Sequence, residues 1–327
     1  QNQLREILEE VMPEVYLAIS SELNPEFREF ERSSTTAAVA YVGPVFEKYV
    51  EKLTQDLERE LTPPPRLYIM QSSGGMLSAK AAVQLPQRTI ESGPAAGVLA
   101  TVDLGRRLDL KNLISFDMGG TTAKASLIED GEVSVTTEYE VGGTGNLRRW
   151  LQGTGHPIKV PVVDLAEVSA GGGSIAWIDK GGFLQVGPQS AGADPGPVCY
   201  DRGGAEVTVT DANLVLGRLN PGYFLGGKME LNLGTTQGRL AELGHQLNLS
   251  ASDAAQAVID VANENMANAI RLVSIERGLD ARDFALVAFG GAGPLHAGGI
   301  LEKMGMTRVV IPLYPGLCSA FGAVISD

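Results

Sequence analysis

Residues 117–124 carry the clearest chemical pattern in the chain, Asp-Met-Gly-Gly-Thr-Thr-Ala-Lys, between two apolar segments of strand character. The pattern predicts a β-hairpin with this run at its bend. Gly119 and Gly120 would let backbone N–H groups converge on phosphate oxygens, because no Cβ stands in the way. The hydroxyls of Thr121 and Thr122 would add donors. We therefore expect a phosphate-binding bend, and a plain hairpin turn is the alternative that fits almost as well.

The same run contains one acid and one base that could take part in a reaction. Asp117 follows an apolar stretch of Leu, Ile and Phe, and a carboxylate at the end of a buried strand can hold Mg²⁺ directly or through water. Lys124 could supply positive charge to the phosphates, although its place on the second strand also lets it point elsewhere. We predict Asp117 as a metal ligand and catalytic residue, and Lys124 as a second catalytic residue.

Residues 289–296, Phe-Gly-Gly-Ala-Gly-Pro-Leu-His, form a second candidate binding site. Gly290, Gly291 and Gly293 lie between a predicted strand and a predicted helix, where a nucleotide can rest on the backbone and the helix N-terminus favours its negative charge. The spacing is not Gly-x-Gly-x-x-Gly, which argues against a Rossmann-type NAD site. A close-packed turn between strand and helix is the alternative. His296 is expected to satisfy a backbone carbonyl rather than to catalyse.

Two further glycine-rich runs, residues 170–174 and 190–197, fit a surface loop and a phosphate or substrate cradle equally well. Asp194 and Asp211 are candidate acids in this region, and a solvated or helix-capping role is the commoner outcome for each. The serines of these runs have no nearby His–acid pattern, which disfavours a serine hydrolase.

The predicted elements place these runs at the ends of strands. Hydrophobic periodicity predicts long helices at residues 3–23, 36–61, 92–108 and 252–277. Short apolar runs predict strands at residues 67–70, 88–91, 112–116, 123–128, 132–139, 284–289 and 307–311. The last two strands, joined by a helix that ends near Met304, predict a βαβ unit with a parallel pair.

Composition narrows the class of protein. Of the 327 residues 40 are glycine, and 24 of these lie between Asp117 and Gly238. The net charge of −13 argues against binding to nucleic acid or to an anionic membrane. Two cysteines and three histidines are too few for a disulfide scaffold or a Cys/His zinc site, and they predict a reducing, cytoplasmic location. No signal peptide or membrane span is expected.

Five runs, in this order, resemble the signature blocks of the hydantoinase A / 5-oxoprolinase family: residues 92–97, 114–124, 170–176, 190–197 and 289–296. The resemblance covers essentially the whole chain. It implies an α/β fold of the actin/sugar-kinase/Hsp70 ATPase type, in which a ribonuclease H-like lobe has a mixed sheet with flanking helices. By this resemblance, residues 117–124 are the second phosphate-binding hairpin and residues 289–296 are the loop on the adenosine side.

The resemblance also implies an activity. Members of the family couple ATP hydrolysis to the opening of a cyclic amide of the hydantoin or 5-oxoproline type through an O-phosphorylated amide, with ATP and Mg²⁺ as cofactors. Many act with a hydantoinase B-type subunit or domain. Two other functions stay open: the ATP-hydrolysing subunit of an acetone- or acetophenone-type carboxylase, and a non-catalytic, ATP-driven reactivating chaperone. Self-association is left open too.

The same resemblance predicts the domain organisation. Family members carry an earlier Asp-x-Gly-Gly-Thr hairpin, and residues 1–116 contain none. We therefore expect a piece of a longer polypeptide, in which residues 1–110 continue from a first lobe outside the chain. Residues 111–327 would form the ATPase-like lobe, with a glycine-rich insertion at 142–238 and the adenosine-side βαβ unit. Alone, the chain is expected to turn over little ATP.

Overall fold

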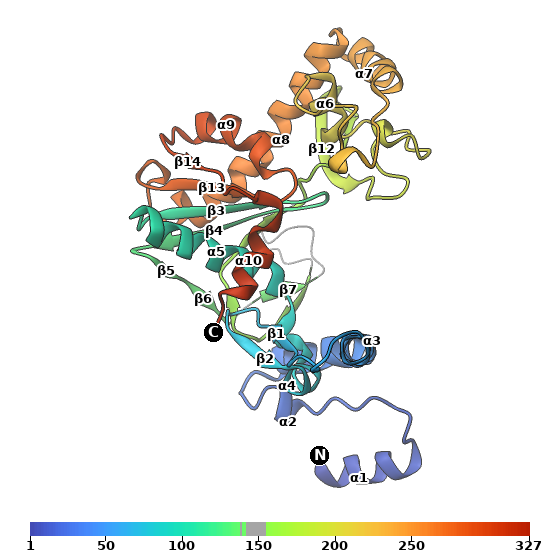
Figure 1. Ribbon diagram of the computed structural model, residues 1–327, viewed down its shortest axis with the longest axis vertical. Coiled ribbons are helices and arrows are strands. Elements are labelled where there is room, and N and C mark those ends of the chain that lie inside the picture. The colour runs from blue at the N-terminus through green and yellow to red at the C-terminus, as the bar shows by residue number, and fades with distance from the viewer. Residues whose placement is uncertain (138, 142–154) are drawn as a thin grey trace.

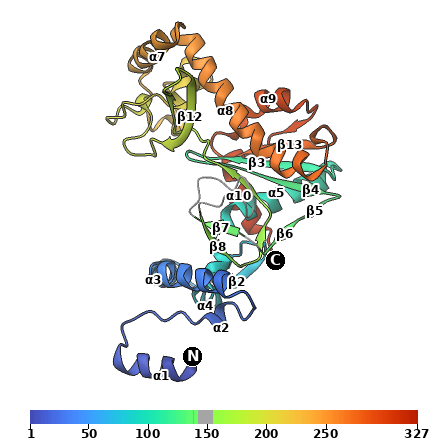
Figure 2. The same ribbon diagram turned by 180° about the vertical axis from the view of Figure 1, so that it is seen from behind.

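The computed structural model describes residues 1–137, 139–141 and 155–327, so residues 142–154 of the expected glycine-rich insertion lie outside the described part. Three tiers follow one another in Figures 1 and 2. The N-terminal helices lie at the bottom, a mixed sheet with helices on both faces lies in the middle, and a second group of helices with a β-hairpin lies at the top. The predicted division into two domains stays a prediction.

The central sheet has six strands in the order β10-β4-β3-β13-β14, with β5 paired to the far end of β4. Their bounds are β3 Leu113–Met118, β4 Ala123–Glu129, β5 Glu132–Val133, β10 Ala166–Val168, β13 Ala285–Phe289 and β14 Val309–Val310. Strands β3, β13 and β14 are parallel, while β4 runs antiparallel to both β3 and β10. The predicted mixed sheet with flanking helices is confirmed.

A parallel pair needs a crossover, and helix α9 (Gly293–Met304) supplies it between β13 and β14. The predicted βαβ unit is therefore confirmed. The carboxyl ends of β3 and β13 lie side by side, because Phe289 stands opposite Asp117 in the parallel register. Two runs that are far apart in the sequence, residues 117–124 and 289–296, thus begin at the same edge of the sheet.

Both faces of the sheet are buried, as its nearly continuous apolar strands require. Ile114, Phe116 and Met118 of β3 belong to the core beneath α8 (Ala251–Val273) and α9. Leu113 belongs to the opposite core, with α5 (Ser92–Leu108) and α10 (Cys318–Val324). Because successive strand residues alternate in direction, Asp117 faces α5 and α10.

Two glycines let α5 and α10 approach each other. A Cβ at Gly322 of α10 would overlap the backbone carbonyl of Ala96, and one at Gly97 of α5 would come within 2.6 Å of the Phe289 ring and 2.9 Å of Ser319 Oγ. The block at residues 92–97 is therefore a packing surface that holds α10 against the sheet near Asp117.

The upper tier in Figure 1 contains the hairpin of β11 (Ser174–Ile178) and β12 (Leu184–Ser190), with α6 (Val209–Val215) and α7 (Leu233–Leu247). Helix α8 packs against α6 and α7 at one end and against β4 and β10 lower down, so it joins this tier to the sheet. The lower tier contains α1 Asn2–Val11, α2 Ser20–Leu23, α3 Glu29–Glu60, β1 Tyr68–Met70, β2 Met76–Ser78 and α4 Ala79–Gln84. Short strand pairs connect the lower tier to the sheet: β6 Val135–Thr136 with β9 Val162–Val163, and β7 Tyr139–Val141 with β8 His156–Ile158.

Several predicted elements are wrong in their extent or type. The predicted helix at 3–23 is interrupted, because Pro13 cannot donate a helical hydrogen bond and excludes the residue before it from helical geometry. The predicted strand at 88–91 is instead a 3₁₀ turn, Pro86–Thr89, which begins at a proline. The predicted strand at 132–139 is divided into separate strands that pair with different partners. Within the described residues, no helix is long and apolar enough to cross a bilayer.

Candidate nucleotide-binding site

The β-hairpin predicted at residues 117–124 forms as expected. Asp117 stands opposite Lys124 in the register of β3 and β4, and the Gly119 N–H donates to the Thr122 carbonyl at 3.1 Å across the bend. Gly119 and Gly120 are exposed, and a Cβ added at either would meet no atom within 4 Å. One side of the bend is therefore open backbone, and side chains at these two positions would fill the space that the glycines leave free.

The other side of the bend is covered by the glycine run at 170–174. The Gly172 N–H donates to the Gly119 carbonyl at 3.0 Å and the Gly173 N–H to the Gly120 carbonyl at 2.6 Å. A Cβ at Gly171 would lie 2.5 Å from the Thr121 nitrogen, so the close approach requires glycine there. This run supports the bend from behind, and residues 171–173 are buried, so the surface-loop alternative is wrong. A role of the run as a phosphate or substrate cradle stays a prediction.

The 190–197 run and the start of α6 both donate hydrogen bonds to the glycine run at 170–174. The Ala191 N–H, at the start of the 190–197 run, donates to the Gly173 carbonyl at 2.8 Å. On the other flank, the backbone N–H and the hydroxyl of Thr210 in α6 both donate to the Gly172 carbonyl at 2.8 Å. The glycine runs at 170–174 and 190–197 and the start of α6 thus converge on the hairpin.

The predicted adenosine-side loop, residues 289–296, meets the hairpin at Asp117. A Cβ at Gly290 would lie 2.5 Å from the Met118 carbonyl oxygen and even closer to Asp117 Oδ1, and the φ of Gly290 is +84°. The Ala292 N–H donates to the Met118 carbonyl at 3.0 Å, which ties the loop to the end of β3. Gly291 has open space where a Cβ would stand, while Gly293 begins α9 beneath the loop. The structure therefore places Gly290 against Asp117 and Gly293 against the neighbouring backbone of β3, with Gly291 exposed between them.

Burial raises the pKa of the Asp117 carboxyl, while the positive charge of Lys124 and a hydrogen bond from Ser319 act in the opposite direction. Burial likewise raises the pKa of Glu167 in β10. Lys124 forms an ion pair with Glu91, and its Nζ lies 3.7 Å from Glu167 Oε1. The predicted phosphate-binding lysine is thus at the site, but two carboxylates compete for its charge.

Glu91 and Glu167 also lie at the site, and the sequence does not predict either of them. Glu91 has a left-handed conformation, with a φ of 65°. Its position immediately before the 92–97 block is the one feature of the sequence that points to it. Glu167 belongs to a three-residue strand with no motif. With Asp117 they place three carboxylates around one lysine, and this excess negative charge suits a cation.

The chemistry of these donors fits Mg²⁺ bound together with phosphate. Among the described residues, no group of three or more His, Cys, Asp or Glu side chains could hold a metal ion by itself. Mg²⁺ is commonly held by one or two carboxylates, with substrate phosphates and water completing its shell. Asp117, beside an open glycine bend, meets this requirement.

The remaining candidate residues have structural roles or lie apart from the hairpin. Asp211 is fully buried, where its carboxylate accepts hydrogen bonds from the backbone N–H groups of Cys199 and Thr208 at 2.8 Å and forms the capping box of α6. Asp194 is exposed in the 190–197 loop. His296 is buried against the side-chain amides of Asn213 and Asn263, so the expected backbone carbonyl partner is wrong.

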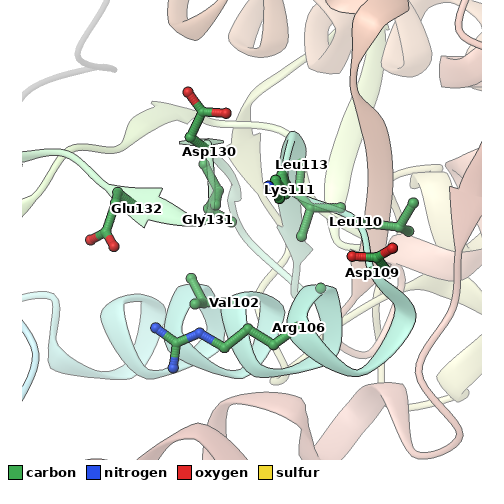
Figure 3. A pocket seen from close by; sticks show the side chains of 11 residues that line it. Val102, Arg106, Asp109, Leu110, Lys111, Leu113, Asp130, Gly131 and Glu132 are labelled. Carbon is green, nitrogen blue, oxygen red and sulfur yellow. The ribbon is translucent and has the colours of Figure 1, made fainter.

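A pocket of about 280 Å³ lies at the opposite end of β3 from Asp117, between the end of α5 and the turn before β5. Val102, Leu113 and Ile128 line its floor. Figure 3 shows charged side chains at its rim, with Arg106 and Glu132 toward one side and Asp109 toward the other. No residue of the predicted site lines this pocket.

Comparison with known proteins finds relatives that are similar along nearly the whole chain. Caprolactamase subunit alpha of Pseudomonas jessenii is 39% identical over 321 residues, which cover 97% of this chain and 44% of that subunit. The 5-oxoprolinase of Saccharomyces cerevisiae is 35% identical over 328 residues, covering 95% of this chain and 24% of that protein.

Two solved structures share the fold along the whole chain. The nucleotide-free structure of acetone carboxylase superposes with a TM-score of 0.86 at 30% identity, over 100% of this chain and 45% of that one. The crystal structure of ATP-dependent caprolactamase from Pseudomonas jessenii gives a TM-score of 0.79 at 36% identity, with the same coverage of 100% and 45%. The chain spans less than half the length of each of these proteins.

The sequence profile described as Hydantoinase/oxoprolinase matches residues 32–327, and this range contains all five glycine-bearing blocks. On this match, and on the shared fold, the chain belongs to the hydantoinase/oxoprolinase family.

Proposed function

We propose that this chain is the nucleotide-binding part of an ATP-dependent hydrolase subunit that opens a cyclic amide of the hydantoin or 5-oxoproline type. The observation that carries the proposal is the meeting of the open glycine hairpin with the Gly290 loop around the half-buried carboxylate of Asp117. The names of two relatives, a caprolactamase subunit and a 5-oxoprolinase, support a cyclic amide as the substrate.

Each predicted site residue has a place in this proposal. Asp117 would hold Mg²⁺, and the backbone N–H groups and hydroxyls of residues 119–122 would bind the phosphates of ATP. Gly290, Gly291 and Gly293 would lie under the adenosine. Phosphoryl transfer depends mainly on positioning and charge neutralisation, and a preformed bend supplies both. Lys124 would act at longer range, because Glu91 and Glu167 already draw on its charge.

The chemical purpose of ATP in this proposal is activation of the amide. Transfer of the γ-phosphoryl group from ATP to the amide oxygen would release ADP and make the carbonyl carbon more electrophilic. One water would then attack that carbon, and the ring C–N bond would break as the nitrogen takes up a proton, leaving an acyl phosphate. A second water would hydrolyse the acyl phosphate to a carboxylate and inorganic phosphate. A hydantoinase B-type subunit or domain would complete the enzyme, and the cytoplasm is its proposed location. The isolated chain should turn over little ATP, since it spans less than half of its relatives.

One specific observation favours a second function. The acetone carboxylase structure superposes on the whole chain with a TM-score of 0.86, so the chain could equally belong to the ATP-hydrolysing subunit of a ketone carboxylase. Both functions would use the proposed nucleotide site, and they would differ in the acceptor of the phosphoryl group.

A substrate screen with the full-length protein and its partner subunit separates the two functions. Phosphate release would be measured with lactams, hydantoins and 5-oxoproline, and in parallel with ketones plus bicarbonate. ATP-dependent ring opening is the expected result. Carboxylation of a ketone without ring opening would favour the second function. Full turnover by an Asp117→Ala variant would refute the nucleotide site itself.

A further inference from the structure

A buried network of polar side chains joins α6, α8 and α9 just beyond the adenosine-side loop. His296, in the first turn of α9, is 1% exposed, and its Nδ1 lies 2.7 Å from Asn263 Oδ1 in α8. Its Nε2 lies 3.3 Å from Asn213 Nδ2 in α6. An amide oxygen only accepts and an amide NH₂ only donates, so Nδ1 carries the proton and Nε2 accepts. The imidazole is therefore neutral and fixes the orientation of the Asn213 amide.

That orientation presents the oxygen of Asn213 to Arg218. Arg218 Nη1 donates to Asn213 Oδ1 at 3.3 Å, and Nη2 donates to Gln256 Oε1 of α8 at 3.4 Å. Both acceptors are neutral amides, and no ion pair of Arg218 with a carboxylate occurs in the described ranges 1–137, 139–141 and 155–327. The residue is exposed, directly after Gly217 at the end of α6. Its guanidinium is thus oriented but keeps its full charge and an open face.

Arg218 lies at the far end of α6 from the phosphate hairpin. The start of α6 reaches the hairpin through Thr210 and Gly172, and the helix has seven residues, a length of about 10 Å. At its other end, the charge of Arg218 is close enough to His296 to help burial lower the pKa of that imidazole to about 4. His296 follows Gly293 by three residues. A nucleotide with its phosphates on the hairpin and its ribose at the Gly290 loop would therefore extend toward Arg218.

We infer that Arg218 contacts the base of the bound nucleotide, with the plane of its guanidinium stacked on the purine. A guanidinium is planar, is weakly hydrated for a cation and stacks well on aromatic rings. Asn213 and Gln256 are positioning residues that accept hydrogen bonds from the guanidinium group of Arg218, and His296 fixes the orientation of Asn213. Lys124 cannot take this part, because it lies at the phosphate end and is ion-paired. The inference rests on the proposed nucleotide site and adds the residue that recognises the base.

The test compares binding of two ligands by the full-length protein in the presence of Mg²⁺: ATP, and inorganic triphosphate, which has no base. Arg218→Gln should weaken ATP binding about fivefold or more, which corresponds to the loss of about 1 kcal/mol or more expected for one stacked base. Triphosphate binding should stay unchanged. Arg218→Lys, which keeps the charge but loses the planar group, should weaken ATP binding nearly as much. Arg66→Gln, at an exposed arginine before β1, is the matched control and should leave both ligands unaffected.

Three results would overturn the inference. Equal weakening of ATP and triphosphate by Arg218→Gln would place the arginine at the phosphates. Full ATP binding by Arg218→Lys would mean that charge, rather than stacking, matters. Unchanged binding of both ligands by Arg218→Gln, while Asp117→Asn abolishes Mg-ATP binding, would remove Arg218 from the site and leave the proposed function standing. If Asp117→Asn also binds Mg-ATP normally, the proposed function itself is wrong.

Discussion

Gly290→Ala should strongly destabilise the sheet at the proposed nucleotide site. The φ of Gly290 is +84°, and an L-residue in a left-handed conformation costs about 1–2 kcal/mol. The new Cβ would also lie 2.5 Å from the Met118 carbonyl oxygen, which the surrounding sheet keeps from moving away. Overpacking of this kind costs about 1–3 kcal/mol. The free energy of unfolding should therefore fall by about 2–5 kcal/mol.

The adjacent glycine offers a matched control. A Cβ at Gly291 would meet no atom within 4 Å, so Gly291→Ala should change the free energy of unfolding by less than about 0.5 kcal/mol. If nucleotide occupies that open space, the same substitution should weaken Mg-ATP binding without destabilising the protein. The pair thus separates backbone strain from a steric effect on the ligand.

Urea unfolding of the full-length protein, followed by tryptophan fluorescence and far-UV circular dichroism, measures the first effect. Isothermal titration with Mg-ATP measures the second. A loss of less than about 1 kcal/mol for Gly290→Ala would refute the packing argument, since the left-handed backbone alone should cost that much. Unchanged Mg-ATP binding by Gly291→Ala would argue that the ligand does not lie over this loop.

Three other substitutions test the charges of the site and the buried histidine. Asp117→Asn should abolish Mg-ATP binding in calorimetry and leave the free protein at least as stable at pH 7. Burial raises the pKa of Asp117 above 3.8, so the charge on this carboxylate lowers the free energy of unfolding as pH rises. A variant that is less stable than the wild type would contradict this argument. Lys124→Met should lower the free energy of urea unfolding by about 3 kcal/mol, because it leaves Glu91 and Glu167 without their cation. Adding Glu91→Gln to this variant should recover part of the lost stability. If the effects of the two single substitutions simply add, the ion pair is not stabilising. Folding lowers the pKa of His296 from 6.5 to about 4, so the free energy of unfolding should fall by about 3 kcal/mol as pH drops through that interval. Unfolding curves at pH 7, 5.5 and 4.5 measure this pH dependence, and the His296→Gln variant should lack it.

Local pattern was sufficient for the elements whose order depends on neighbours in the chain. The hairpin at 117–124, helix α5 and the β13-α9-β14 unit have almost their predicted bounds, because each combines a clear hydrophobic period with glycine or proline at its ends. The single helix predicted at 3–23 is wrong, because the chain leaves the helical conformation before Pro13 although the periodic pattern continues past it. The strand predicted at 88–91 is also wrong, because Pro86 begins a 3₁₀ turn that extends to Thr89.

The sequence by itself determined the family, the hairpin and the glycine runs that line the candidate site, since glycine spacing reports backbone geometry directly. Only the tertiary structure decided which charges share that site. Lys124 meets Glu91 and Glu167 because α5, β4 and β10 converge in space, and no local rule relates positions so far apart in the chain. In the same way, the neutral amides around Arg218 come from different helices, and only packing shows that its charge has no carboxylate partner among the described residues.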